Sequence, residues 1–231
     1  MIMKKLIATD FDGTFFRNGK VDEYDLRQVA LWREKGYKFG FVTGRGSDFF
    51  TTLRELGVDA DFVIVYNGSL VADFDGNTLF EAFVHREDFV KIQRYFEASP
   101  NVRGFSKATD EELYRHYYAS YETSAEALKA AAQLNEMYGD KISAFVNGVH
   151  VNIGARGTGK SQGVAFILDY YGFGADEGAA VGDDWNDLQM ILDHDGWTVD
   201  TACDEIKAKA PHICGGIGDL VKTLLDNNRI S

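Results

Sequence analysis

Cysteine is scarce in this sequence, which limits what can hold the fold together. The only two cysteines, Cys203 and Cys214, show neither a CxxC pair nor the histidine spacing of a zinc site. A disulfide framework and a structural zinc site are therefore not expected. This cysteine usage is typical of a reducing compartment, and we expect a cytoplasmic protein.

Long hydrophobic runs are also missing. No stretch of roughly 18 apolar residues occurs, so the sequence predicts no membrane span. The apolar run after Lys4 and Lys5 is too short for the core of a signal peptide, and acidic residues follow it at once. We expect neither a targeting segment nor a membrane partner.

Positive charge is outnumbered and dispersed. The chain carries 24 Lys and Arg against 36 Asp and Glu, a formal net charge of -12, and its basic residues form no cluster. A nucleic acid partner is therefore not expected. An anionic substrate is still compatible with this balance if a metal ion or a few basic side chains reverse the sign of the charge locally.

The first 68 residues alternate between buried strands and helices. Their apolar runs are typical of strands buried on both faces, and a loop is expected at 11–19. The expected strands are 4–10, 38–44 and 60–68, and the expected helices are 21–36 and 47–57, the second capped by Ser47. This order predicts an α/β fold with a doubly wound parallel sheet.

The alternation then breaks. Residues 70–84 indicate a hairpin that turns at Asp75 and Gly76. The block that follows combines helices at 86–98 and 122–139 with a strand at 101–107 and a hairpin that turns at Asn147 and Gly148. A small α+β domain is therefore expected at 82–151.

The α/β pattern resumes after the inserted block. The expected elements are a helix from 161, strands at 179–184 and 197–200, a helix at 186–196, a helix ending near Pro211 and a last helix at 218–228. The core domain is therefore expected to comprise residues 1–81 and 152–231, split by the insertion.

Two carboxylates follow the first buried strand. Asp10 and Asp12 belong to DFDGT, past the carboxyl end of the strand, where open α/β sheets bind their ligands. The same DFDG string recurs at 73–76, but there it lies in a hairpin turn, where Asp-Gly is ordinary turn chemistry. We predict a functional role for the first copy only.

Two further strand ends carry polar residues. In VTGR the hydroxyl of Thr43 and the backbone amides near Gly44 can bind phosphate oxygens, although a plain strand-to-helix turn is an alternative. GDDWND places Asp183, Asn186 and Asp187 at another strand end, where they could also be only a polar helix start. Because the ends of parallel strands share one edge, these segments are expected to meet.

Such a meeting would require a cation. If Asp10, Asp12, Asp183 and Asp187 come within ~4 Å of one another, each like-charge pair costs roughly 4 kcal/mol at an effective dielectric near 20. Oxygen ligands favour Mg²⁺ over zinc, and the five histidines show no metal-ligand pairing. The sequence predicts Mg²⁺ as the cofactor.

Residues 154–161, GARGTGKS, satisfy the phosphate-loop pattern G-x-x-x-x-G-K-S/T. A nucleotide hydrolase would need an acidic strand and a nucleotide-sized core after this loop, but only about 70 residues remain. It would also leave the amino-terminal carboxylates unexplained. We instead expect the glycines to form a flexible return to the core that delivers Lys160 at the start of a helix.

Asp10, Asp12, Thr43, Lys160 and Asp183 follow one another in this order, each at a strand end or helix start. This order resembles the four motifs of haloacid dehalogenase-superfamily phosphatases, over the whole chain. The insertion between VTGR and the lysine resembles the C2-type cap of the Cof-type subgroup, although it is shorter than in many members. The resemblance implies a Rossmann-like catalytic core with an inserted α+β cap.

The resemblance also implies roles for the residues at the matching positions. Asp10 would attack phosphorus and form an aspartyl-phosphate, and Asp12, held in a drier setting, would protonate the leaving oxygen and later activate water. Mg²⁺ would be bound by the aspartates, directly by Asp183 and by the backbone carbonyl of Asp12, with Asp187 and Asn186 in support. Phosphoryl oxygens would be held by Thr43, Gly44 and Lys160.

The implied substrate is a small phosphorylated metabolite such as a sugar phosphate, with specificity set by the cap. Asn147, His150 and Arg115 are candidate substrate contacts in the cap, and further polar or aromatic candidates are Arg103, Lys107, Tyr117 and Tyr118. Two other functions would use the same core residues. One is a phosphotransferase or mutase, and the other is a receiver that is phosphorylated on aspartate without turnover.

Overall fold

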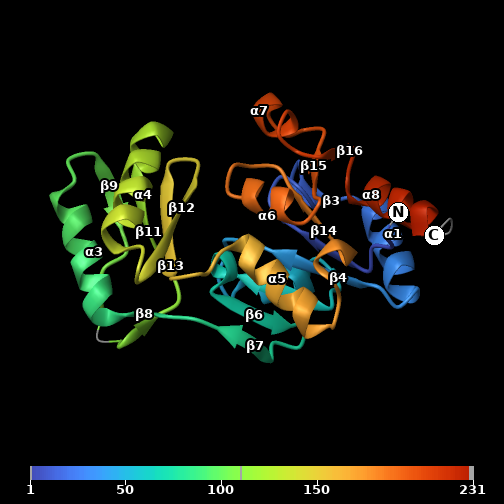
Figure 1. The fold of residues 1–231 in the computed structure, drawn as a ribbon, viewed down its shortest axis with the longest axis horizontal. Coiled ribbons are helices and arrows are strands. Elements are labelled where there is room, and N and C mark those ends of the chain that lie inside the picture. Colours follow the sequence, from blue (N-terminus) through green and yellow to red (C-terminus); the bar gives the residue numbers. More distant parts are fainter. Residues whose placement is uncertain (1, 110, 229–231) are drawn as a thin grey trace. The chain divides into compact units, whose positions relative to one another are not determined.

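The computed structural model describes residues 2–109 and 111–228 (Figure 1). The chain divides into two compact units, a core unit of residues 1–79 and 160–231 and an inserted unit of residues 80–159. The inserted unit is longer at both ends than the sequence indicates. The inserted unit extends past residue 151 because β13 (His150–Ala155) pairs with β12 over its full length and also with β11.

An eight-stranded sheet of order β16-β15-β14-β1-β4-β5-β6-β7 forms the centre of the core unit (Figure 1). Its strands are β1 (Leu6–Thr9), β4 (Lys38–Val42), β5 (Phe62–Val65), β6 (Leu70–Asp73), β7 (Thr78–Glu81), β14 (Gly178–Gly182), β15 (Trp197–Val199) and β16 (His212–Cys214). All neighbours from β16 to β5 are parallel, and β6 runs antiparallel to β5. The predicted doubly wound parallel sheet is confirmed.

Side chains of the central strands alternate between two apolar layers. In β1, Ile7 belongs to one buried cluster while Leu6 and Ala8 belong to the other, as expected for a strand covered on both faces. The helices of the core unit are α1 (Glu23–Glu34), α2 (Phe49–Glu55), α5 (Lys160–Tyr170), α6 (Leu188–Asp193), α7 (Asp204–Lys207) and α8 (Ile217–Asn228). Buried side chains of α1, α2, α7 and α8 fill the layer of Ile7, and those of α5 fill the opposite layer.

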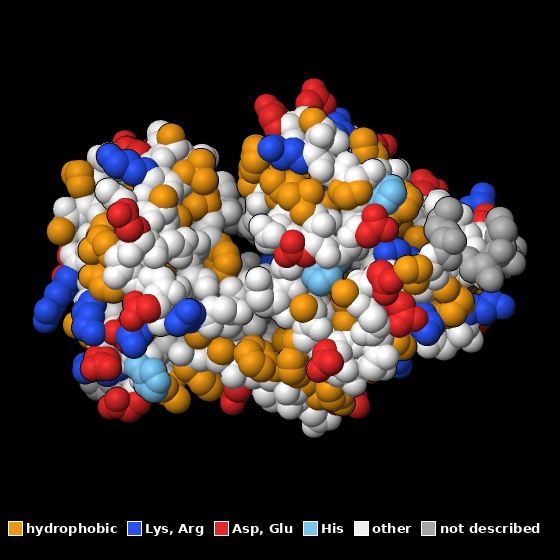
Figure 2. Space-filling view, viewed as in Figure 1, with side chains coloured by type: hydrophobic (Ala, Val, Ile, Leu, Met, Phe, Trp, Pro, Cys, Tyr) orange, Lys and Arg blue, Asp and Glu red, His pale blue; other side chains and the backbone are white. Residues whose placement is uncertain are grey.

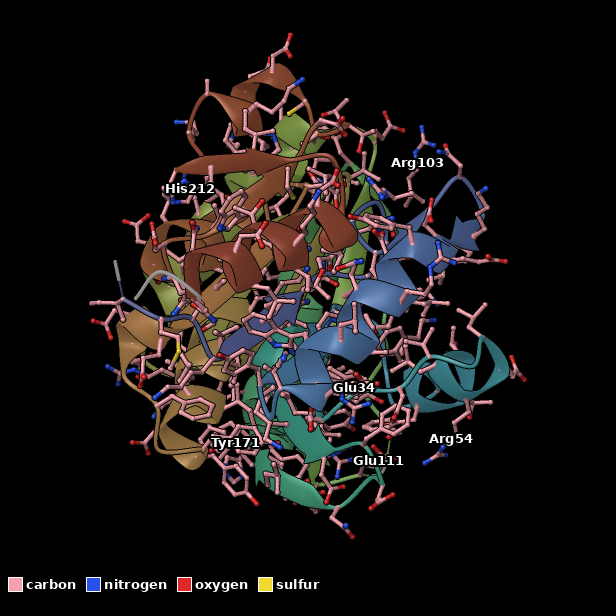
Figure 3. All side chains as sticks on the ribbon, turned by 90° about the vertical axis from the view of Figure 1, so that its right-hand side faces the viewer. Glu34, Arg54, Arg103, Glu111, Tyr171 and His212 are labelled. Carbon is pink, nitrogen blue, oxygen red and sulfur yellow. The ribbon has the colours of Figure 1, made fainter. Side chains whose placement is uncertain are left out.

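Helix α2 illustrates how these layers form. Phe49, Phe50 and Leu53 are buried, whereas Arg54 extends away from the sheet (Figure 3). The predicted cap at Ser47 is wrong, since Asp48 occupies the N-cap position and makes no side-chain cap bond. The backbone N–H of Ser47 instead donates to the hydroxyl of Tyr66, 3.1 Å away.

The segment predicted as a loop at 11–19 contains part of a short hairpin. Strands β2 (Phe16–Arg17) and β3 (Lys20–Val21) pair antiparallel around Asn18 and Gly19, both of which have positive φ. Phe11, at its start, is buried and packs edge-on against Phe41 and Phe49. This aromatic contact anchors the backbone between Asp10 and Asp12.

The inserted unit has its own sheets and its own apolar cluster. Its elements are β8 (Val84–His85), α3 (Arg86–Ala98), β9 (Val102–Phe105), β10 (Leu113–Tyr114), β11 (Tyr117–Tyr121), α4 (Ser124–Tyr138), β12 (Ile142–Asn147) and β13. The four-stranded sheet has the order β12-β13-β11-β9, and β10 pairs with β8. Helices α3 and α4, strand β9 and the hairpin at Asn147 and Gly148 agree with the sequence prediction.

Two short 3-10 helices complete the described elements, η1 (Tyr66–Gly68) and η2 (Ala175–Glu177). No described helix is both long and apolar enough to cross a membrane. On the face shown in Figure 2, acidic and basic side chains are interspersed on each unit, as the dispersed charges of the sequence indicate.

Candidate active site

Asp10 lies directly past the end of β1, at the carboxyl edge of the parallel sheet. Its backbone N–H donates to the carbonyl of Val181, 2.8 Å away, so the pairing of β1 with β14 continues to this residue. That pairing brings Asp10 next to the segment that follows β14, which begins with Asp183. Only 5% of Asp10 is exposed.

Lys160 is the first residue of α5 and joins two of the predicted motifs. Its Nζ donates to Oδ1 of Asp10 and to Oδ1 of Asp187, both at 2.6 Å. All three side chains are buried. The sequence therefore placed Lys160 correctly at a helix start, and the core unit brings it into the acidic group.

Asp183 is held by the last two residues of DFDGT. The hydroxyl of Thr14 donates to Oδ1 of Asp183 at 2.6 Å. Gly13 has a φ of +86°, and a side chain at this position would collide with the Asp183 carboxylate. Glycine is required here because both the backbone conformation and the close approach exclude a Cβ.

Asp187 closes the turn that follows β14. Its Oδ2 accepts the backbone N–H groups of Asp183 and Asp184, at 3.1 and 3.2 Å, while its Oδ1 accepts Lys160. Asn186 is half-buried in the same turn, and within the described residues its side chain makes no hydrogen bond to this group.

The donor set fits a divalent cation. Asp10, Asp183 and Asp187 each offer a carboxylate oxygen, and these atoms lie within 4.8 Å of one another. Three carboxylates with one ammonium leave a formal charge of about -2 in a buried site, an excess that a bound cation would neutralise. Carboxylate oxygens without nitrogen or sulfur ligands are the donors that Mg²⁺ and Ca²⁺ prefer.

The pKa values of the group reflect burial first and the neighbouring charges second. Burial raises the pKa of Asp10 well above its usual value, more than Lys160 lowers it, and the charges of Asp187 and Asp183 add to the rise. Burial, partly offset by Thr14 and reinforced by Asp187, raises the pKa of Asp183 to about 6. For Lys160, burial favours a lower pKa, but Asp10 and Asp187 outweigh it and raise the pKa above the ordinary value.

Asp12 does not have the environment predicted from the sequence. Its side chain is 52% exposed, and its two oxygens accept Nε and Nη2 of Arg45 at 2.7 and 2.6 Å. The prediction of a drier setting is therefore wrong for this structure. Both carboxylate oxygens of Asp12 are paired with Arg45, and the metal contact predicted for Asp12 is its backbone carbonyl. The carboxylates that could hold a metal ion, the metal-competent group, are those of Asp10, Asp183 and Asp187.

The segment VTGR follows β4, the neighbour of β1 in the sheet. Thr43 is 2% exposed, and its hydroxyl accepts the backbone N–H of Arg45 at 3.1 Å. The hydroxyl hydrogen is thus left to be donated to another acceptor. The guanidinium of Arg45 lies over the rings of Phe11 and Phe49, which steadies the loop between Gly44 and α2.

The cap candidates fall on different parts of the inserted unit. Tyr118, Asn147 and His150 are exposed on the sheet, and Nδ1 of His150 is 2.8 Å from the Ser120 hydroxyl. Tyr117 is a correction, since it is 2% exposed and packs on Phe89 in the apolar cluster. The remaining candidates, Arg103, Lys107 and Arg115, are exposed, and Arg103 pairs with Glu122 while Arg115 pairs with Glu81.

Sequence reasoning missed several residues of the core site. Thr14 could have been found, because it closes DFDGT and only the first DFDG copy has it. Arg45 belongs to VTGR, but nothing in that pattern predicts its pair with Asp12. The predicted strand at 60–68 extends too far, because β5 ends at Val65 and Tyr66–Gly68 form a turn, for which the Asn67-Gly68 pair is a signal.

Comparisons with known proteins give a family model and two relatives that match most of the chain. A family model described as haloacid dehalogenase-like hydrolase matches residues 7–124 and 95–217. A 5-amino-6-(5-phospho-D-ribitylamino)uracil phosphatase of Bacillus subtilis is 25% identical over 226 residues, covering 90% of this chain and 89% of the relative. An HMP-PP phosphatase of Klebsiella pneumoniae is 24% identical over 246 residues, covering 91% and 89%.

A solved structure shares the fold. A haloacid dehalogenase-like hydrolase from Bacillus subtilis superposes with a TM-score of 0.83 at 16% sequence identity. The superposition covers 94% of this chain and 99% of that protein.

Proposed function

Because the chain belongs to the family of haloacid dehalogenase-like hydrolases, we propose that it hydrolyses a small phosphorylated metabolite through an aspartyl-phosphate on Asp10, with Mg²⁺ as cofactor. The family match and the named relatives confirm the predicted Cof-type phosphatase class. The observation that supports the proposed mechanism best is Lys160, which joins Asp10 to Asp187 beside Asp183.

Asp10 is the proposed nucleophile. One of its carboxylate oxygens forms a bond to phosphorus while the bond from phosphorus to the leaving oxygen breaks, and the leaving oxygen takes a proton. A water molecule then attacks the same phosphorus, loses a proton, and releases inorganic phosphate together with the free Asp10 carboxylate. The ammonium of Lys160, 2.6 Å from Asp10, favours the ionised form of this carboxylate and fixes its orientation, although burial opposes ionisation.

Asp12 is the proposed proton donor and acceptor. It lies two residues beyond Asp10 on the same loop, and its exposure leaves it open to a leaving group. Its ion pair with Arg45 has to be exchanged for the leaving oxygen before it can donate a proton. The role proposed for Asp12 therefore includes a rotation away from Arg45 during each cycle.

Thr43, Gly44 and Lys160 are the proposed phosphate ligands. Thr43 keeps a hydroxyl hydrogen for donation, and Gly44 supplies a backbone N–H at the edge of the sheet. Preorganised donors of this kind stabilise the charge that develops on the phosphoryl oxygens. Asn186, in the turn before α6, is a further proposed phosphate ligand.

Asp10, Asp183 and Asp187 are the residues proposed to hold Mg²⁺. Their oxygens are gathered by Lys160, Thr14 and two backbone N–H groups rather than by the metal alone. When bound, Mg²⁺ supplies positive charge that screens the carboxylates from the anionic substrate. The site is thus arranged before the cation binds.

The proposed substrate class is a phosphorylated metabolite with a sugar-like or polyol part. One relative is named for a phospho-D-ribitylamino compound and the other for HMP-PP, so both names describe small phosphorylated molecules. Asn147, His150 and Arg115 of the inserted unit are proposed to select among such leaving groups. Their polar side chains are suited to hydroxyl groups.

The test is release of inorganic phosphate from a panel of phosphorylated metabolites and p-nitrophenyl phosphate. We expect turnover with Mg²⁺, none with EDTA, and none in Asp10→Asn, which keeps the shape of the side chain but is a poor nucleophile. The turn variant Asp75→Asn, from the second DFDG copy, is the matched control and is expected to behave as the wild type. Unchanged turnover by Asp10→Asn would overturn the covalent mechanism.

The same assay separates hydrolysis from transfer. Addition of a sugar acceptor would redirect the phosphoryl group from water to the sugar in a phosphotransferase or mutase. We expect inorganic phosphate to be the product with and without the acceptor. A receiver would release no phosphate in steady state.

A further inference from the structure

Two consecutive residues after β5 adopt a conformation that side chains normally avoid. Tyr66 and Asn67 have φ values of 52° and 50°, and neither is glycine. A bulky aromatic residue with positive φ is an outlier that the surrounding structure must maintain. We call Tyr66 and Asn67 the left-handed corner. Contacts within the core unit maintain this backbone conformation.

The left-handed corner is bonded to the loop that follows β4. The N–H of Tyr66 donates to the carbonyl of Arg45 at 2.8 Å, and the N–H of Asn67 donates to the carbonyl of Thr43 at 3.0 Å. The Tyr66 hydroxyl accepts the N–H of Ser47. These bonds hold the loop that contains the proposed phosphate ligands Thr43 and Gly44.

Side chains of the corner fill the space beside the two glycines of this loop. A Cβ built on Gly44 would lie 3.2 Å from Oδ1 and 3.3 Å from Nδ2 of Asn67. A Cβ on Gly46 would lie 3.0 Å from the Tyr66 hydroxyl. The Asn67 amide is therefore packed directly against Gly44.

This amide has no partner of its own. Asn67 is 4% exposed, and its side chain makes no hydrogen bond within the described residues. A buried amide without partners is costly. Among the described residues, the amide atoms of Asn67 are not fully enclosed, so they remain in contact with solvent.

We propose that Asn67 is a further ligand of the phosphoryl group and donates its side-chain amide beside Thr43 and Gly44. The ligand would satisfy the buried amide, and the positive φ of Asn67 is the backbone conformation that aims it at the loop. Asparagine suits this position because it tolerates positive φ better than most residues and carries a neutral donor. The inference rests on the proposed function, since it adds a donor to the same phosphate site.

The chain provides a matched control. Asn18 and Gly19 repeat the sequence Asn-Gly of residues 67 and 68, and Asn18 has a φ of 52°. Asn18 is exposed in the β2–β3 turn. Replacing either asparagine by glycine keeps the left-handed backbone available and removes only the amide.

The test measures binding of inorganic phosphate in the presence of Mg²⁺ by calorimetry, with thermal unfolding of each variant. We expect Asn67→Gly to raise the dissociation constant for phosphate by about tenfold or more, as for loss of one hydrogen bond to a charged group. Asn67→Asp should weaken binding further, because its charge repels phosphate. Asn18→Gly should bind as the wild type, and the two glycine variants should have similar melting temperatures.

Two results would overturn the inference. One is wild-type phosphate affinity in Asn67→Gly. The other is weak binding that accompanies a melting temperature far below that of Asn18→Gly, since this would assign Asn67 a purely structural role. If the wild type neither binds phosphate nor releases it from any substrate, the proposed function fails instead, so the two failures are distinguishable.

Discussion

At the residue scale, the site depends on one ammonium placed among three carboxylates. Lys160 neutralises part of the charge of Asp10 and Asp187, whereas among the described residues the side-chain hydrogen-bond partner of Asp183 is the hydroxyl of Thr14. Burial, reinforced by the neighbouring carboxylates, raises the pKa values of Asp10 and Asp183, so it is costly to keep both residues ionised. A cation should therefore stabilise the folded chain.

Replacement of Asp183 by asparagine tests whether a cation at this site stabilises the folded chain. Without metal, Asp183→Asn should be at least as stable as the wild type, because the amide oxygen can still accept Thr14 and one repulsive charge is removed. Mg²⁺ should raise the melting temperature of the wild type. At a concentration a hundredfold above the dissociation constant, it should add about 2.7 kcal/mol to the free energy of unfolding. The variant should lose most of this rise in a thermal unfolding titration.

Asp184→Asn is the control for the same substitution one residue away, outside the metal-competent group. It should retain the response to Mg²⁺. Equal stabilisation of Asp183→Asn and the wild type by Mg²⁺ would show that the cation binds elsewhere.

The proposed proton transfer by Asp12 can be tested by comparing substrates whose leaving groups differ in their need for a proton. Asp12→Asn cannot donate a proton, so hydrolysis of an alkyl phosphate should slow by roughly 10²–10⁴-fold. Release of p-nitrophenol needs little protonation, so p-nitrophenyl phosphate should give a burst equal to the enzyme concentration, followed by slow turnover. Rapid-mixing absorbance measurements distinguish the two phases.

A burst is expected only if Asp12 also activates water in the second step. Equal slowing of both substrates without a burst would argue that Asp12 acts in binding rather than in proton transfer. Asp22→Asn, at the N-cap of α1, is a control that alters a carboxylate outside the proposed site.

Single residues at strand ends were predictable, but their partners were not. Asp10, Asp183 and Lys160 could be assigned because polar residues after apolar strands stand out in the sequence. The pair of Asp12 with Arg45 could not, because ion pairing depends on side-chain rotamers that no local pattern encodes. The positive φ of Tyr66 is likewise imposed by tertiary contacts, in this case with Arg45 and Ser47.

At the element scale, the strongly apolar strands and amphipathic helices were predictable and the short strands were not. β11 has the sequence YYASY, in which Tyr117, Ala119 and Tyr121 are buried on one side. Its period of two indicates a strand, although Tyr117 and Tyr118 are candidate substrate contacts in the sequence prediction. β16 has three residues, too few to show a period.

Helix α4 offers a test of local stabilisation in the inserted unit. Its Thr123 and Glu126 form a reciprocal capping box, with the side chain of each accepting the backbone N–H of the other. Thr123→Ala should lower the free energy of unfolding of this unit by about 1 kcal/mol. Thr123→Ser keeps the hydroxyl and should restore most of it in urea titrations followed by circular dichroism. An unchanged midpoint for Thr123→Ala would show that the capping bond contributes nothing to stability.

At the scale of the whole molecule, the residues of the candidate active site lie in the core unit, and the inserted unit has an apolar cluster of its own. The core unit draws Asp10 and Lys160 together from positions 150 residues apart. The order of strands and helices predicted this because parallel strands share a carboxyl edge. The extent of the insertion was less predictable, because β13 continues its pairing up to Ala155 without any change in composition.

His194 should reduce the stability of the chain in mild acid, whereas Asp10 and Asp183, whose pKa values are raised, act in the opposite direction. Burial lowers the pKa of His194, whose Nε2 is 3.1 Å from the carbonyl of Ser161. Below its ordinary pKa of about 6.5, the unfolded chain gains a proton that the folded chain resists. The contribution of His194 to the free energy of unfolding should therefore fall as the pH drops from about 7.5 to about 5.5, by at most about 1.4 kcal/mol per pH unit.

Urea unfolding at a series of pH values checks this. His194→Gln should flatten the dependence, whereas the exposed His85→Gln should not. An unchanged slope in His194→Gln would show that other groups cause the loss in acid.

The most direct measurement of the central claim is chemical trapping of the phosphorylated residue. Borohydride reduces an aspartyl-phosphate to homoserine, so the chain is quenched during turnover, reduced, digested and analysed by peptide mass spectrometry. The account predicts that homoserine replaces aspartate at position 10 alone, and only when substrate and Mg²⁺ are present. Active turnover with no reduction at Asp10, or with a phosphoryl group on another residue, would contradict it.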